Sequence, residues 1–204
     1  MDHDDDEFQG VYVMRPPIDD AGLHLRVVGG LEWDRGIRII RGDEVPDQPL
    51  VLERSSGHEE RTFLTTEEHP LLLISLEAAR ELKAAEVTGW ASFPTRISGD
   101  RMLTDRYTGF AVTGRCGPIL DTLSRPVKTE GFRGTDTVMR GLLFDPASRS
   151  TAGIWMPANA AVLFADERVR ELFAGRGFDD VEFVLATEAN NVVAKPPRRR
   201  PALP

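Results

Sequence analysis

The stretch 71–97, LLLISLEAARELKAAEVTGWASFPTRI, decides the fold of this chain. Its first four residues form a short apolar run typical of a strand, and Ser75 is a residue type that commonly caps a helix. Residues 76–86 consist almost entirely of strong helix formers, and the Thr-Gly pair soon after them ends the helix before an extended segment. The stretch therefore predicts a strand–helix–strand unit.

A second unit of the same kind is predicted about 90 residues later. An apolar strand, a cap at Asp166, a helix over 167–174 and a closing strand over 181–186 follow in the same order. Both helices contain Arg-Glu-Leu, at residues 80–82 and 170–172, which aligns them with an offset of 90 residues. The ordered match predicts an internal duplication.

Most of the remaining segments are predicted to be short strands. Before residue 71, β-branched or alternating runs are separated by glycine, proline and aspartate turns, which is typical of antiparallel hairpins or a meander. The predicted strands outside the two units cover residues 8–14, 23–28, 37–40, 50–53 and 107–113. Residues 135–145 and 151–156 are predicted to be strands or loops at the edges of the two units. We therefore predict an α+β fold with mixed or antiparallel sheets, two similar strand–helix–strand units and few helices.

Composition divides the chain into four regions. The beginning is acidic with almost nothing to bury, so we expect a mobile or loosely docked tail there, and the end is rich in proline and arginine, so we expect an extended tail. The regions are an acidic N-terminal tail over 1–7, a β-rich region over 8–70, an α+β region with the two repeated units over 71–188 and a Pro/Arg-rich C-terminal tail over 189–204.

Charge and composition exclude several classes of protein. The net charge is −8, and residues 1–70 hold 17 acidic against 7 basic side chains, which disfavours a general nucleic-acid binder. No apolar run approaches the roughly 18 residues of a membrane helix. The acidic start is unlike a signal peptide, and the single cysteine excludes an internal disulfide framework. We therefore expect a cytoplasmic protein with neither nucleic acid nor membrane as its partner.

No complete catalytic, metal or cofactor motif is present in the sequence. His58-Glu59-Glu60 would need a second histidine at position 62 to match a zinc protease motif, and that position is Thr62. Cys116 follows Arg115, whose charge would lower the pKa of the thiol, but no local hydrolase signature surrounds it. We expect no catalytic residue, no metal and no cofactor.

Two segments resemble bacterial immunity-protein family eleven of the polymorphic toxin systems. Residues 72–97 are similar to its strand, serine, helix, Leu/Val-Thr-Gly, strand, Phe-Pro unit, and residues 154–183 to its Pro-Asn, strand, Asp-Glu, helix segment. The family's tyrosine, aspartate and serine positions are occupied by Tyr107, Asp121 and Ser124. The resemblance covers roughly residues 70–188. It implies a cytoplasmic antidote, not an enzyme, that binds and blocks a cognate toxin.

The acidic surplus in residues 1–70 then predicts the contact face. A basic toxin would be steered to it by complementary charge, and an aromatic side chain there would serve as an anchor. The candidate contact residues are Asp19, Asp20, Glu32, Trp33, Asp34, Asp43 and Glu44.

Several alternatives stay open at this stage. The acidic surplus could serve only solubility, and Trp33 could belong to the protein's own core. The chain could instead be a small cytoplasmic hydrolase that uses Cys116 and a histidine, or a regulatory or structural interaction module.

Overall fold

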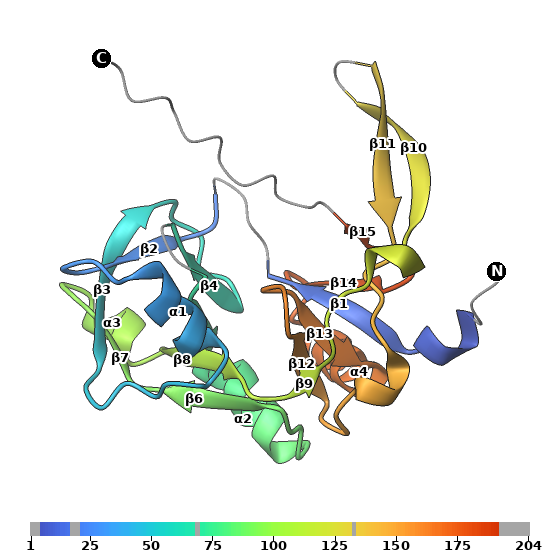
Figure 1. Cartoon of the computed structure of the whole chain (residues 1–204). Coiled ribbons are helices and arrows are strands. Elements are labelled where there is room, and N and C mark those ends of the chain that lie inside the picture. Colours follow the sequence, from blue (N-terminus) through green and yellow to red (C-terminus); the bar gives the residue numbers. More distant parts are fainter. Residues whose placement is uncertain (1–4, 17–20, 68–69, 132–133, 192–204) are drawn as a thin grey trace.

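The computed structural model describes residues 5–16, 21–67, 70–131 and 134–191. This part of the chain forms mixed β-sheets, three short 3-10 turns and four α-helices (Figure 1). The helices are α1 (Trp33–Ile40), α2 (Leu76–Ala84), α3 (Arg101–Thr104) and α4 (Glu167–Arg176). The predicted α+β class with few helices is confirmed.

The first sheet has seven strands in the order β6-β8-β5-β4-β2-β3-β7. Its strands are β2 (His24–Val27), β3 (Leu50–Ser56), β4 (Phe63–Thr66), β5 (Leu72–Ser75), β6 (Trp90–Phe93), β7 (Thr95–Ile97) and β8 (Tyr107–Val112). The edge strands β6 and β7 are consecutive in the chain and only Pro94 separates them, so the sheet curves until its edges approach each other. It wraps around a buried cluster that includes Leu25, Leu52, Leu73, Ile97 and Leu103.

The second sheet has five strands in the order β14-β1-β13-β12-β9. Its strands are β1 (Val11–Arg15), β9 (Arg115–Cys116), β12 (Ile154–Pro157), β13 (Leu163–Asp166) and β14 (Glu182–Leu185). The N-terminal strand β1 therefore lies between two strands from the C-terminal third of the chain. A third, smaller sheet contains β10 (Arg125–Gly131), β11 (Gly134–Arg140) and β15 (Asn190–Asn191), and the β10–β11 hairpin extends away from both larger sheets (Figure 1).

The two predicted strand–helix–strand units have the same topology. In the first, β5 and β6 lie on either side of β8 and are joined by α2; in the second, β13 and β14 lie on either side of β1 and are joined by α4. The predicted caps are confirmed: Ser75 Oγ accepts a hydrogen bond from Ala78 N at 3.2 Å, and Asp166 Oδ1 accepts one from Val169 N at 3.1 Å. Each cap satisfies one amide of the first helical turn.

The caps and strand registers set the two units 91 residues apart. The offset of 90 taken from the shared Arg-Glu-Leu is therefore wrong by one residue in the helices, and that tripeptide match is a coincidence of composition. With the offset of 91, Leu82 and Phe173 are equivalent, as are Ala78 and Val169, and all four are buried in one cluster. The helices α2 and α4 share this core between the two sheets, and Arg176 pairs with Glu81 at 2.8 Å beside it.

Two sequence expectations are corrected by the fold. Residues 37–40 are not a strand but the end of α1, because Gly36, Ile39 and Ile40 are buried at helical spacing while Arg38 between them is exposed. The extended segment after α2 is two strands on opposite edges of the sheet, since Pro94 separates them.

The boundary at residue 70 does not separate two sheets. Strand β4, before this boundary, pairs with β5 after it, so the β-rich region and the first unit share one sheet.

Candidate partner-binding surface

The seven candidate contact residues fall into three groups. Glu32, Trp33 and Asp34 lie at the start of α1, Asp43 and Glu44 follow its C-terminal end, and Asp19 and Asp20 lie outside the described residues. Five of the seven therefore lie on α1 or directly beside its ends, and we call residues 32–44 the α1 surface.

Trp33 is exposed at the first turn of α1. Its side chain keeps 57% of its accessible area, so the alternative that this ring lies in the protein's core is wrong. The apolar side chains of Val28 and Val45, before and after the helix in sequence, are 45% and 62% exposed. Tryptophan is among the residue types enriched in protein interfaces, so the exposed indole is the informative one of these three side chains.

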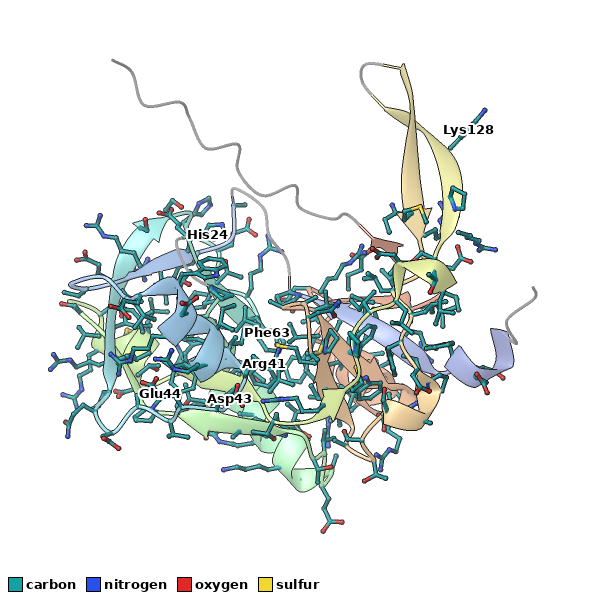
Figure 2. All side chains as sticks on the ribbon, in the orientation of Figure 1. His24, Arg41, Asp43, Glu44, Phe63 and Lys128 are labelled. Atoms are coloured by element: carbon teal, nitrogen blue, oxygen red, sulfur yellow. The ribbon has the colours of Figure 1, made fainter. Side chains whose placement is uncertain are left out.

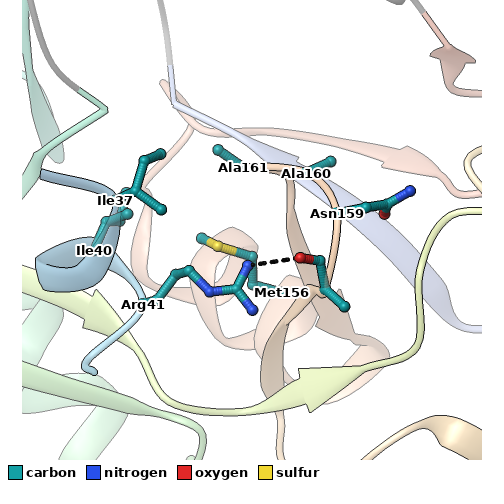
Figure 3. A pocket seen from close by; sticks show the side chains of 8 residues that line it. Ile37, Ile40, Arg41, Met156, Asn159, Ala160 and Ala161 are labelled. Carbon is teal, nitrogen blue, oxygen red and sulfur yellow. Dashed lines mark hydrogen bonds between the residues drawn. The ribbon is translucent and has the colours of Figure 1, made fainter. Parts of the chain in front are cut away.

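Two open hollows lie against α1. The larger, of about 400 Å³, lies between the turn after β2 and the segment before β3, and its lining includes Val28, Leu31 and Arg35. The smaller, of about 200 Å³, lies between α1 and the segment joining β12 to β13 (Figure 3). Its lining comprises Ile37, Ile40, Arg41, Met156, Ala158, Asn159, Ala160 and Ala161.

Glu44 is paired with two arginines of α1. Arg35 Nε donates to Glu44 Oε1 at 2.7 Å, and Arg38 Nε donates to Oε2 at 3.2 Å. The hydrogen bond from Arg35, followed by the charges of both arginines, lowers the pKa of Glu44 below its usual value. This carboxylate is therefore ionised and engaged within the protein.

Asp43 is also held by arginines. Its carboxylate lies 3.0 Å from Arg115 Nη2 and 3.5 Å from Arg41 Nε. Arg115 further donates to the carbonyl oxygens of Arg41, Val112 and Gly114, so it ties the end of α1 to the first sheet. A cation there satisfies a carbonyl group at the helix C-terminus.

The α1 surface is balanced in charge rather than acidic. Figure 2 shows Arg41, Asp43 and Glu44 close together at the end of α1. The four acidic candidates are matched in number by four arginines that the sequence reasoning did not select, Arg35, Arg38, Arg41 and Arg115, and all four arginines pair with Asp43 or Glu44. Arg35, Arg38 and Arg41 are spaced three residues apart, which places them next to one another on a helix. Because residues 37–40 were predicted to be a strand, this helical spacing was not used to select them.

Cys116 does not have the environment of a nucleophile. Its side chain is 5% exposed, and burial raises the pKa of the thiol to about 12, against a smaller opposing effect of Arg149. The expectation that Arg115 lowers this pKa is wrong, because the guanidinium of Arg115 is directed to Asp43 and the end of α1. The thiolate, which is the reactive form, is thus strongly disfavoured.

Within the described ranges, no three histidine, cysteine, aspartate or glutamate side chains are grouped closely enough to hold a metal ion. In the same ranges, no helix has the length and apolar character needed to cross a membrane. No protein-family model matches this chain, and no curated protein sequence does either.

Proposed function

We propose that this chain is a cytoplasmic immunity protein that binds and neutralises a cognate bacterial toxin without catalysing a reaction. The observation that carries the proposal is the exposed Trp33 at the first turn of α1, a helix whose other residues help to line two hollows. Tryptophan and arginine are the residue types most often responsible for binding energy in protein interfaces. The α1 surface combines both.

The sequence motifs support the same reading. The two segments that resemble immunity-protein family eleven coincide with the two equivalent strand–helix–strand units, whose helices share one core. They therefore account for the scaffold, while α1 lies outside them. A scaffold common to a family with a separate contact helix is a reasonable arrangement for proteins that each recognise a different partner.

The main rival is the hydrolase that uses Cys116. Its thiol is buried with a pKa near 12, and burial of this kind is typical of a structural cysteine. The other rival, an interaction module unrelated to a toxin, differs from the proposal only in the identity of its partner. Binding to a defined toxin therefore separates these readings.

The test uses the purified protein encoded by the reading frame next to this one as the toxin. We expect the wild-type chain to form a complex with it and to protect cells that express it. Trp33→Ala should raise the Kd about 30-fold or more, as for an interface anchor worth at least 2 kcal/mol, while the melting temperature stays unchanged. The control is Leu185→Ala, which trims an exposed apolar side chain on the second sheet. Absence of both complex and protection would contradict the proposal.

A further inference from the structure

The smaller hollow on α1 has the size of a site for one side chain. Its volume of about 200 Å³ is below the roughly 300–1,000 Å³ of sites that enclose small molecules. Ile37 and Ile40 line it from α1, while Met156, Ala160 and Ala161 line it from the β12–β13 segment (Figure 3). These walls are apolar, so the hollow suits an apolar group presented by a larger partner.

The walls of this hollow are fixed by hydrogen bonds. Arg41 Nη1 donates to the carbonyl oxygens of Pro157 at 3.1 Å and Ala158 at 3.3 Å, which holds the β12–β13 segment against α1. Asn159 pairs with the backbone of Ile119 through both ends of its amide, at 2.8 and 3.1 Å. A hollow held in this way does not have to be ordered by its ligand, which lowers the entropic cost of binding.

The hollow begins about one helical turn from the exposed indole, because Ile37 lines it. Ile37 follows Trp33 by four residues and Arg41 follows Ile37 by four, so the three lie along one side of the helix. Eight residues of helix extend about 12 Å, which is within reach of one short segment of a partner. A segment that covers Trp33 can therefore place a side chain in the hollow.

The charge at the C-terminal end of α1 indicates which chemical group of the partner should lie next to the apolar side chain in the hollow. Although Glu32 and Asp34 balance the charge of the α1 surface as a whole, at its C-terminal end Arg35 and Arg38 share the carboxylate of Glu44, and Arg41 and Arg115 share that of Asp43. The side chain of Arg38 is 50% exposed and that of Arg35 is 44% exposed. Partly exposed guanidinium groups in excess bind carboxylates well, because their donors match the two oxygens.

We propose that this hollow takes one apolar side chain of the toxin, and that a carboxylate next to it in the toxin pairs with the arginines at the end of α1. This inference rests on the proposed function. It narrows the partner to a toxin whose contact segment joins an apolar residue to an aspartate or glutamate, rather than one that is basic at this point.

The test fills the hollow and reverses the charge separately, using the same toxin from the neighbouring reading frame. Ala161 is an exposed residue that lines the hollow, so the larger ring of Ala161→Phe can fill the hollow from its rim. This variant should raise the Kd about 30-fold or more. Arg38→Glu should raise it about 10-fold, mainly through slower association. The controls are Ala161→Ser, which leaves the hollow open, and Arg101→Glu, which reverses a 94% exposed arginine on α3. Both controls should bind within about twofold of wild type.

The outcomes separate this inference from the proposed function. If wild type binds, Trp33→Ala weakens binding, and both Ala161→Phe and Arg38→Glu bind normally, the hollow is not a contact and the inference fails while the proposed function stands. If wild type neither binds nor protects, both fail. A wild-type dimer that Ala161→Phe separates would show that a second copy occupies the hollow, which also overturns the inference. Unchanged thermal unfolding of each variant is required, and Ala161→Leu replaces Ala161→Phe if the latter does not fold.

Discussion

Glu86 and Gly177 offer a paired test of the duplicated units. Both follow a helix of a unit, they are 91 residues apart, and both have a positive φ, 53° for Glu86 and 75° for Gly177. The hydrogen bonds around them are the same: Val87 N donates to Leu82 O at 2.9 Å, and Phe178 N donates to Phe173 O at 3.0 Å. This is the glycine-type ending of a helix, and in the first unit a glutamate occupies the glycine position.

The expected effect follows from the backbone alone. A left-handed conformation costs a residue with a Cβ about 1–2 kcal/mol, whereas glycine loses about 0.5–1 kcal/mol more entropy on folding. Glu86→Gly should therefore stabilise the protein by about 0.5–1 kcal/mol. A Cβ at Gly177 would meet nothing within 4 Å, so Gly177→Glu should destabilise it by a similar amount through backbone strain alone.

Equilibrium urea unfolding of the two variants and of wild type measures these differences. For a chain of this size the shifts correspond to about 1–4 °C in Tm. Lys83→Gly, within the regular part of α2, is the matched control and should destabilise by about 1 kcal/mol. If Glu86→Gly destabilises the protein as Lys83→Gly does, Glu86 is not strained and the equivalence of the two helix ends is refuted.

Three further predictions concern the joint between the sheets, the cysteine and the α1 surface. Gly89→Ala should lower the free energy of unfolding in urea by about 3 kcal/mol, because the new Cβ would lie 2.0 Å from the Ile154 carbonyl oxygen. Gly99→Ala is the control and should lower it by about 1 kcal/mol, because a Cβ there meets nothing within 4 Å. Equal losses would contradict the close approach of Gly89 to Ile154. Cys116 should react with a thiol reagent at pH 8 at least about 100-fold more slowly in the native than in the urea-unfolded protein, and equal rates would contradict its burial. Since the pKa of Glu44 is lowered on folding, its stabilising effect is present above its ordinary pKa of 4.5 and is lost as the pH falls below it. Glu44→Gln should therefore destabilise the protein at pH 6, and the difference from wild type should shrink as the pH falls from 4.5 through the lowered pKa of the folded state. A difference that stays constant with pH would refute the pairing with arginine.

The two strand–helix–strand units could be predicted from the sequence because their signals are local. Ser75 and Asp166 cap helices of strong helix formers, and a break follows each helix within a few residues. The register between the units could not be predicted in this way. It depends on the pairing of β5 with β8 and of β13 with β1, which joins residues far apart in sequence.

The α1 surface was predicted only in part. Trp33 could be selected as an aromatic side chain in a polar segment, but its exposure depends on how α1 lies against the first sheet. Asp43 and Glu44 were selected for their charge, although their arginine partners neutralise much of it. Arg115 could not be anticipated as a partner, because the fold alone brings it to a residue 72 positions earlier.

Survival of cells that express the toxin from the neighbouring reading frame tests the central claim most directly. Wild-type chain and Cys116→Ala should protect to the same extent, because protection depends on binding and not on catalysis. Trp33→Ala, expressed at the same level and with the same Tm, should protect markedly less. Full protection by Trp33→Ala together with complete loss of protection by a stably folded Cys116→Ala would contradict the account and favour an enzyme.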